Sequence, residues 1–373
     1  MKIVQFVAML LLFAGVNGAV VYRLWRLMPP LRWFRGSVTL LLLAVIAAPF
    51  VVMAWGNALP LPLVSLLYMV GLSWLILLIY LILLFLLIDG LSLLGFFGVQ
   101  RLKSLKLWTH ESWVGTVGVV VLMAVLAVYG NYNYHQKERV ELTMRVEKAM
   151  AQPLRIVVVS DLHLGYSIGR EELERWVVLI NREEPDVVLL VGDVIDTSLR
   201  PLEVERMAEV LRRLSSRYGV YAVAGNHEHY ATLAKSAPFF SDAGIRLLRD
   251  EVLLIDNRCY FVGRDDYMNK QRKPLSVLLS GVDVAKPIVL LDHQPRALGE
   301  ARAAGADIHF AGHTHRGQIW PISLLVEQMY EQAYGYRRFG AMQSYVSSGL
   351  GIWGGKFRIG TKSEYVVVTL QGR

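Results

Sequence analysis

Four long apolar stretches occupy the first third of this chain of 373 residues and constrain its fold more than any other feature. A helix that crosses a bilayer needs about 20 predominantly apolar residues. Stretches of about this length are residues 3–21, 38–55, 61–88 and 113–129, and none of them contains a charged side chain. Charged residues inside a membrane usually mark transport paths. We therefore expect residues 1–130 to form a bundle of about four transmembrane helices that anchors the chain.

The distribution of positive charge predicts how this bundle is oriented. Residues 1–135 hold eight lysines and arginines against two acidic residues, so they account for six of the eight net positive charges. This basic balance belongs to the membrane region and does not predict a nucleic-acid surface. Loops rich in Lys and Arg stay in the cytoplasm, and the two basic loops here are residues 22–36 and 101–106. We therefore expect a multi-pass protein of the inner or plasma membrane, with its soluble domain on the periplasmic or extracellular side.

The remaining residues have the pattern of an α/β domain. Residues 131–138 resemble a short polar linker, and the domain is predicted to span residues 139–373. Residues 139–146 alternate polar and apolar side chains, as in a half-buried strand. Continuous apolar runs alternate with helical periodicity at residues 170–184 and 203–214, which favours a largely parallel sheet. The predicted buried strands are residues 154–160, 185–192, 219–225, 286–292, 306–312, 343–349 and 363–370.

Residues suited to metal binding follow five of these predicted strands directly. Ligands of open α/β sheets bind at the carboxyl ends of the strands. Each residue also has an ordinary explanation, such as a helix cap, a turn residue or a core histidine. Five strand ends that all carry metal-binding side chains nevertheless favour one shared site. In chain order the residues are Asp161, His163, Asp193, Asn226, His227, His293, His313 and His315.

These residues form a series of motifs that resembles a known family. The series D-x-H, G-D, G-N-H-E, a lone His and G-H-x-H, in this order, is similar to that of the calcineurin-like metallophosphoesterases. The stretches "DLHLG", "GNHE", "DHQP", "GHTHRGQ" and "SSGLGIWG" look like the membrane-anchored branch with N-terminal transmembrane helices. The resemblance covers about residues 140–370. It implies an α/β domain in which two mixed β-sheets are sandwiched by helices.

The resemblance also implies a role for each residue. It implies two divalent metal ions, manganese first and iron, zinc or magnesium as alternatives, with Asp193 bridging them. His227 would bind no metal and act as the catalytic residue that faces the substrate. The spacing of two in "HTH" would let neighbouring imidazoles serve different ions while Thr314 points elsewhere. The first ion would be held by Asp161, His163 and His315, and the second by Asn226, His293 and His313.

The implied activity is hydrolysis of a phosphoester or pyrophosphate bond by attack of a metal-bound hydroxide. Anchoring makes the lipid bilayer a partner and favours an envelope lipid or a lipid-linked phosphate as substrate. A soluble nucleotide or phosphodiester is the alternative, and we expect no nucleic-acid partner. The natural substrate, the preference among monoester, diester and pyrophosphate, and the oligomeric state remain open. A metal-binding scaffold and a transport-associated regulatory domain are disfavoured by the complete ligand set and the charge-free spans.

Several positions depart from the common pattern or have two interpretations. Arg316 is a candidate substrate contact, or else a surface residue. His229 is either a further imidazole in the pocket or a packing residue, and packing is favoured. Asp196 and Glu228 are expected to orient the ligands. Residues 347–355 form either a mobile loop on the substrate side or a tight turn with a buried Trp353.

Overall fold

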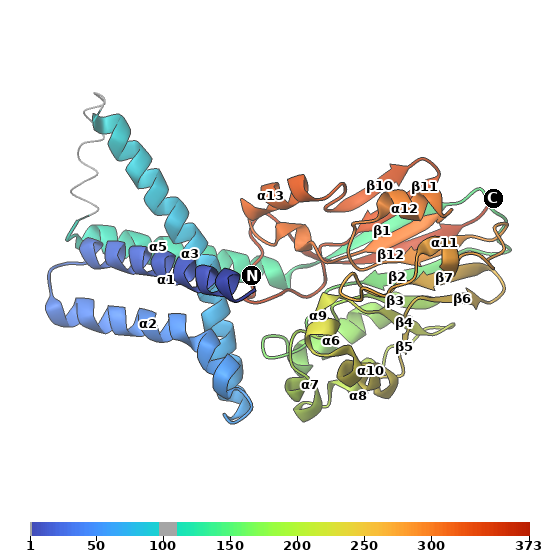
Figure 1. The fold of residues 1–373 in the computed structure, drawn as a ribbon, viewed down its shortest axis with the longest axis horizontal. Helices are drawn as coiled ribbons and strands as arrows, with labels where there is room; N and C mark the ends of the chain where they lie inside the picture. The colour runs from blue at the N-terminus through green and yellow to red at the C-terminus, as the bar shows by residue number, and fades with distance from the viewer. Residues whose placement is uncertain (1, 97–109) are drawn as a thin grey trace. The chain divides into compact units, whose positions relative to one another are not determined.

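The computed structural model describes residues 2–96 and 110–373 and divides into two compact units (Figure 1). The first unit ends at Gly130, and the second runs from Asn131 to Arg373. The basic loop at residues 101–106, which supports part of the predicted orientation, lies outside the described residues.

The first unit is helical. The described part of the chain contains four helices that are long and apolar enough to cross a membrane. Side chains from α1 and α3, among them Val20, Trp74 and Phe85, form the core of this unit. The helices are α1 (Lys2–Leu27), α2 (Arg32–Trp55), α3 (Leu61–Phe96) and α5 (Trp113–His135).

All four helices are longer than the predicted apolar stretches, and the added residues of α1, α2 and α3 include charged side chains. Helix α1 continues through Arg23 and α3 continues through Asp89, and the candidate spans end at Leu27 and Leu94. The Arg23 guanidinium donates two hydrogen bonds to the Asp89 carboxylate, at 2.8 and 2.6 Å. The predicted stretches themselves contain no charge, since Arg23 and Asp89 lie beyond their ends at residues 21 and 88. The paired Arg23 and Asp89 neutralise each other, which lowers the cost of placing both side chains near a membrane.

The segment predicted as a linker is instead part of regular structure. Helix α5 continues to His135, and strand β1 begins at Lys137. The Tyr134 side chain is fully buried, and its hydroxyl donates to Glu172 Oε1 at 2.6 Å. The Asn133 amide donates to the backbone carbonyls of Arg358 and Thr361, at 2.9 and 2.7 Å. These contacts make the end of α5 an integral part of the α/β unit.

The second unit contains two six-stranded sheets of mixed direction, which confirms the predicted fold class. Most neighbouring strands are parallel, while β12–β2, β10–β11 and β6–β7 are antiparallel. The first sheet has the order β1 (Lys137–Arg145), β12 (Ser363–Gln371), β2 (Leu154–Val159), β3 (Val187–Val191), β4 (Val220–Val223) and β5 (Arg246–Leu247). The second has the order β10 (Gly335–Phe339), β11 (Met342–Val346), β9 (Ile308–Ala311), β8 (Ile288–Leu291), β7 (Cys259–Gly263) and β6 (Glu251–Ile255).

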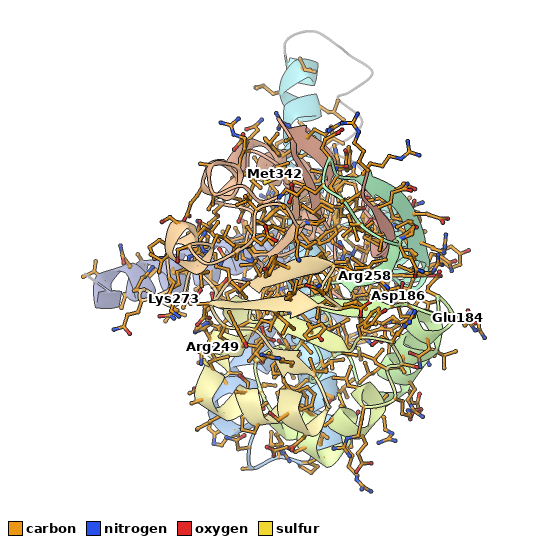
Figure 2. All side chains as sticks on the ribbon, turned by 90° about the vertical axis from the view of Figure 1, so that its right-hand side faces the viewer. Glu184, Asp186, Arg249, Arg258, Lys273 and Met342 are labelled. Carbon is orange, nitrogen blue, oxygen red and sulfur yellow. The ribbon has the colours of Figure 1, made fainter. Side chains whose placement is uncertain are left out.

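Side chains alternate along the strands, so each sheet has two apolar faces. In β2, Ile156 and Val158 point into a core shared by both sheets, whereas Val157 and Val159 point toward helices. Side chains fill the space between the sheets (Figure 2). Burial on both faces explains why these strands are continuous apolar runs.

Helices cover the outer faces of both sheets. Helices α6, α7, α8 and α10 contribute to the core over the first sheet, and α11 and α12 to the core over the second. The predicted helix at residues 203–214 is broken at Arg206, which has a left-handed backbone (φ 54°). The helices of this unit are α6 (Arg170–Asn181), α7 (Arg200–Val204), α8 (Met207–Leu211), α9 (Asn226–Tyr230), α10 (Leu233–Asp242), α11 (Leu275–Leu278), α12 (Leu298–Ala303) and α13 (Ile322–Met329), with the 3₁₀ turn η2 (His315–Gly317).

Candidate metal centre

The predicted site residues lie just past the ends of strands from both sheets. Four of them stand two residues beyond the last residue of β2, β3, β8 and β9, and one stands three residues beyond β4. The candidate residue therefore occupies nearly the same position after each of the five strands. These residues are Asp161, Asp193, His293, His313 and Asn226.

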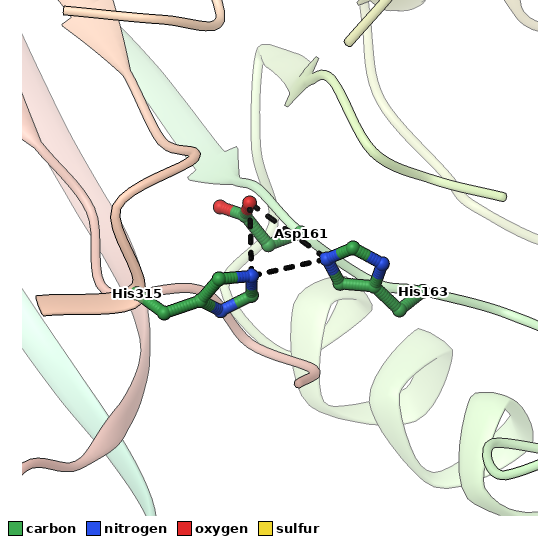
Figure 3. A group of neighbouring side chains, drawn as sticks. All are labelled: Asp161, His163 and His315. Atoms are coloured by element: carbon green, nitrogen blue, oxygen red, sulfur yellow. Dashed lines mark hydrogen bonds and ion pairs between the residues drawn. The ribbon is translucent and has the colours of Figure 1, made fainter. Parts of the chain in front are cut away.

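One cluster contains Asp161, His163 and His315 (Figure 3). The two imidazole Nε2 atoms are 3.1 Å apart. Asp161 Oδ1 lies 3.5 Å from His315 Nε2 and 4.0 Å from His163 Nε2. Three potential ligand atoms thus converge on one point although the residues come from segments about 150 positions apart.

A second cluster contains Asp193, His293 and His313, whose potential ligand atoms all lie within 4.8 Å of one another. His293 Nε2 is fully buried and faces the Asp193 carboxylate. Asn226 Oδ1 is also buried and has no hydrogen-bond partner among the described residues. An unpaired buried polar atom is costly, so this amide oxygen is expected to serve a ligand.

Asp193 stands between the two clusters. Its Oδ2 atom is 3.1 Å from His293 Nε2 in the second cluster and 3.8 Å from His163 Nε2 in the first. Its Oδ1 atom accepts a hydrogen bond from the backbone N–H of His227 at 2.9 Å. One carboxylate oxygen is therefore held in place while the other faces both clusters.

The two histidines of the "HTH" segment belong to different clusters. His315 lies beside His163, with ring centroids 5.0 Å apart, and His313 lies beside His293, with centroids 5.3 Å apart. Between them, the Thr314 hydroxyl donates to the backbone carbonyl of Ala333 at 2.6 Å. The threonine side chain thus points away from the site, as predicted.

The backbone at these positions is unusual. Asp161, His163, Asp193, His313 and His315 all have positive φ angles, between 47° and 68°. Left-handed backbone costs a non-glycine residue of the order of 1–3 kcal/mol and is concentrated at functional sites. Five such residues in one site indicate that the fold is strained to aim these side chains.

Two glycines make room for the carboxylates. A Cβ atom at Gly225 would lie 2.2 Å from Asp193 Oδ1, and one at Gly312 would lie 2.4 Å from Asp161 Oδ2. No larger residue fits at either position without moving a carboxylate. The glycines in "GNH" and "GHTH" are thus explained by close approach to the two acidic groups.

Asp196 and Glu228 support the site in different ways. The Asp196 carbonyl lies 2.7 Å from His227 Nδ1, and its carboxylate Oδ1 lies 3.6 Å from His163 Nδ1. The Glu228 carboxylate accepts hydrogen bonds from three backbone N–H groups, those of Asp193, Ile195 and Gly225, at 2.7–3.0 Å. Asp196 therefore orients two imidazoles, whereas Glu228 holds the turns after β3 and β4 together.

His227 is buried beside the first cluster, with its ring centroid 4.5 Å from that of His163. Its Nδ1 is engaged by the Asp196 carbonyl, so that nitrogen carries a proton and Nε2 remains for other partners. Burial lowers the pKa of His227, but hydrogen bonding to Asp196 and the charge of Asp193 raise it further, to about 9.

The donor set fits divalent cations. Burial, with the neighbouring His293, lowers the pKa of His313 to about 3, and burial lowers the pKa of His315 in the same direction. Both imidazoles are therefore neutral at pH 7, the form that binds metal. Carboxylates, neutral imidazoles and an amide oxygen without thiolate suit manganese, iron, zinc or magnesium and do not select among them.

Other candidate residues lie outside the two clusters. His229 Nε2 lies 3.0 Å from Asp265 Oδ1, so this imidazole belongs to an ion-pair network. The Arg316 guanidinium lies 4.5 Å above the Tyr334 ring, with Nε 4.0 Å from Glu327 Oε1. Trp353 is 42% exposed, so of the two alternatives the tight turn with a buried tryptophan is wrong.

Arg358 was not identified from the sequence. It is fully buried, and its Nη1 donates to the backbone carbonyl of His315 at 2.8 Å. The available signal was an arginine three residues after the glycine-rich segment 347–355. That pattern is also typical of an exposed loop.

Comparison with known proteins shows clear similarities. A model of the calcineurin-like phosphoesterase family matches residues 154–317. A zebrafish (Danio rerio) protein named transmembrane protein with metallophosphoesterase domain is 34% identical over 275 residues, which is 69% of this chain. The chain spans 62% of that relative, less than two thirds of its length.

An uncharacterized metallophosphoesterase of Aquifex aeolicus is 31% identical over 263 residues, which is 67% of this chain and 99% of that protein. Among solved structures, the 5'-nucleotidase precursor of Thermus thermophilus is similar, with a TM-score of 0.36 and 16% identity. That similarity covers 58% of this chain and 55% of the nucleotidase chain.

Proposed function

Because the chain belongs to the calcineurin-like phosphoesterase family, whose members are metal-dependent phosphoesterases, we propose that it hydrolyses a phosphoester or pyrophosphate bond at the candidate metal centre. The observation that carries this proposal is the position of Asp193 Oδ2. It faces His293 Nε2 at 3.1 Å and His163 Nε2 at 3.8 Å, as expected of a carboxylate shared by two ions.

The residues divide into two sets of ligands. Asp161, His163 and His315 would hold the first ion, and Asp193 would contact both. Asn226, His293 and His313 would hold the second, which would provide a partner for Asn226 Oδ1. When bound, two divalent ions polarise the phosphoryl oxygens and supply a nucleophile from water at neutral pH. Manganese is our first choice, with iron, zinc and magnesium as alternatives.

His227 is proposed as the catalytic acid. Its Nδ1–H donates to the Asp196 carbonyl, which fixes the ring and directs Nε2 away from Asp196. A proton on Nε2 would pass to the oxygen that leaves when the phosphoester bond breaks, since imidazole suits proton transfer near neutral pH. Arg316, which follows His315 directly, is proposed to contact the substrate phosphate as a bidentate donor.

The α/β unit is proposed to act on the periplasmic or extracellular side of the membrane. The four apolar helices support anchoring, and the arginines of residues 22–36 support a cytoplasmic location for the first loop. Anchoring favours a substrate that is itself a membrane lipid or carries a lipid. A soluble nucleotide or phosphodiester is the alternative outcome of the test.

The test uses the full chain in detergent, stripped of metal by a chelator and then supplied with manganese. A chromogenic phosphodiester is assayed beside the matching monoester, with Asp193→Ala as the negative variant. Metal-dependent turnover that Asp193→Ala loses would support the proposal, and the ratio of the two rates would define the preferred bond. A wild-type chain that binds none of manganese, iron, zinc and magnesium would overturn it.

A further inference from the structure

Helix α13 exposes its apolar side chains. Leu325 and Met329 are 56% and 73% exposed, Leu324 is also exposed, and Trp320 just before the helix is 53% exposed. Soluble surfaces rarely gather several large apolar side chains in one short segment, and such patches mark interaction sites. Four of them here lie within ten residues of sequence.

A second exposed tryptophan belongs to a loop that adjoins this segment. The backbone N–H of Trp320 donates to the carbonyl of Ile359 at 2.7 Å, and the Gln318 amide donates to the carbonyl of Gly355 at 3.4 Å. Trp353, two residues before Gly355, is 42% exposed. We call Trp320, Leu324, Leu325, Met329 and Trp353 the α13 face.

The α13 face is built onto the segment that carries His315. At Gly317, the last residue of η2, a Cβ atom would lie 2.5 Å from the Cα of Ser323 in α13. Arg316 contacts both Tyr334 and the α13 residue Glu327. A surface that binds the α13 face is therefore held close to the candidate metal centre.

We propose that the α13 face is a membrane-binding surface that lies in the headgroup layer of the bilayer. The α13 face combines leucine and methionine side chains with two tryptophans. This composition is typical of segments that lie in the membrane interface, because indole rings favour the boundary between lipid and water. The bilayer is the occupant we infer because α5 combines a candidate span with Asn131–His135 of the α/β unit. This covalent connection keeps the bilayer at a high effective concentration.

The inference also identifies a class of substrate, and this step rests on the proposed function. A site held at the headgroup layer meets phosphates carried by membrane amphiphiles in preference to soluble ones. Arg316 directly follows His315 and lies 4.0 Å from the α13 residue Glu327, where a cationic donor suits an anionic headgroup. The favoured substrate is therefore a phosphoester or pyrophosphate whose alcohol carries an acyl or prenyl chain.

Fluorescence quenching tests membrane contact without any reference to activity. The chain has one cysteine, Cys259, which is buried and whose thiol pKa burial raises to about 12, so it resists labelling at neutral pH. An environment-sensitive fluorophore is attached to Met329→Cys in the full chain, in nanodiscs of phosphatidylcholine and phosphatidylglycerol. Val284→Cys is the matched control, since Val284 is 74% exposed and Met329 is 73% exposed.

The expected result is a blue-shifted emission at position 329 that headgroup-labelled quencher lipids reduce several-fold more than the emission at position 284. Equal quenching at the two positions would overturn the proposal. A blue shift at position 329 that no lipid quencher reduces would also overturn it, because protein would then cover the α13 face.

A pair of substrates with the same scissile bond tests the second step. One substrate is methyl p-nitrophenyl phosphate in solution, and the other is hexadecyl p-nitrophenyl phosphate in nanodiscs. Both are assayed with the wild type and with the double variant Leu325→Glu/Met329→Glu. We expect the variant to lose about tenfold or more on the hexadecyl diester, since charges replace side chains that lie in the interface, and to keep its rate on the methyl diester. If the wild type and the variant hydrolyse the hexadecyl diester at equal rates, the assigned substrate class would be overturned. Failure of the wild type on both diesters would count against the proposed function, and the quenching result would still decide on membrane contact.

Discussion

The buried guanidinium of Arg358 is hydrogen-bonded to the backbone of His315, with Nη1 2.8 Å from the carbonyl oxygen. Its Nη2 donates to the carbonyls of Ser348 and Gly351 at 2.5 and 3.1 Å. Burial lowers the pKa of Arg358 to about 10, so it stays charged at neutral pH. One cation therefore fixes both the glycine-rich loop and the backbone of a proposed metal ligand.

Replacing Arg358 should weaken the first metal site selectively. Loss of groups that orient ligands typically costs about 10–100-fold in metal affinity, so Arg358→Met should bind one manganese tightly and the other weakly. Arg358→Lys should recover part of the affinity, because an ammonium reaches some of the same carbonyls. Metal content after dialysis against defined manganese concentrations measures this. Two tightly bound ions in a variant with lowered thermal stability would mean that Arg358 is purely structural.

Asn226→Ala should abolish hydrolysis and leave the fold intact. Asn226 Oδ1 has no hydrogen-bond partner among the described residues, so removing this oxygen breaks no hydrogen bond to them. Loss of a residue that only orients a metal ligand lowers activity by up to about 100-fold. Loss of a direct ligand should have at least as large an effect, so we expect kcat/KM to fall by at least about 100-fold. Asn181→Ala is the control, because it deletes an amide that makes two hydrogen bonds and is not a candidate metal ligand. Activity retained in Asn226→Ala would remove Asn226 from the second site.

Much of the site followed from the sequence because its residues occupy equivalent positions after buried strands. Asp161, Asp193, His293 and His313 each stand two residues past a strand end, and apolar runs locate strand ends well. Which residues share a cluster depends on contacts across about 150 positions, as between His163 and His315. The spacing of these residues along the sequence does not by itself predict which of them share a cluster.

The missed features depend on partners that are distant in sequence. Arg23 pairs with Asp89, 66 positions away, where α1 and α3 continue beyond the predicted stretches. Arg358 is buried because carbonyls of another loop receive its hydrogen bonds. Asn133 belongs to the α/β unit because Arg358 and Thr361 offer carbonyls more than 200 positions later. Hydropathy and periodicity describe neighbours along the chain and cannot supply such partners.

Stability should depend on the carboxylate of Asp265 in a defined pH range. Burial raises the pKa of Asp265, but hydrogen bonds from His229, Asn269 and Arg249 lower it further, to well below its usual range. Arg249 is labelled in Figure 2. A carboxyl group whose pKa is lowered by folding stabilises the folded state at pH values above its pKa in the unfolded chain, about 3.9. This stabilisation is lost as the pH falls toward the pKa of the folded state. The pKa of His229 is raised by Asp265, so its contribution is lost as pH rises through that raised value.

Asp265→Asn should therefore lower the melting temperature at pH 7 by several degrees, corresponding to about 1–3 kcal/mol for a buried, charge-assisted network. The difference from wild type should shrink below about pH 4, where Asp265 of the unfolded wild-type chain begins to take up its proton. Thermal unfolding of the full chain in detergent measures both. Asp283→Asn, which alters an exposed ion pair with Lys286, should change little. A difference between Asp265→Asn and wild type that is constant from pH 7 to about pH 2 would contradict the assignment.

A reporter fused after Arg373 should be active only on the outer side of the membrane. Arg23, Arg26, Arg32 and Arg35 lie in or beside the loop between the first two candidate spans. Orientation follows the number of Lys and Arg residues and not the net charge, so the ion pairs of Arg23 and Arg35 do not weaken this argument. With that loop in the cytoplasm, four spans place both Asn57 and Arg373 outside.

Alkaline phosphatase needs disulfides that form only after export, so its fusions after Asn57 and after Arg373 should both be active. Green fluorescent protein fused at the same two points should show little fluorescence. The fusions after Asn57 and after Arg373 control for each other, because the predicted location of both positions depends on the first loop being cytoplasmic. A fluorescent fusion at Arg373 beside an exported fusion at Asn57 would mean that an odd number of spans follows Asn57. The α/β unit would then lie in the cytoplasm, and its substrate would be one of the inner leaflet or the cytosol.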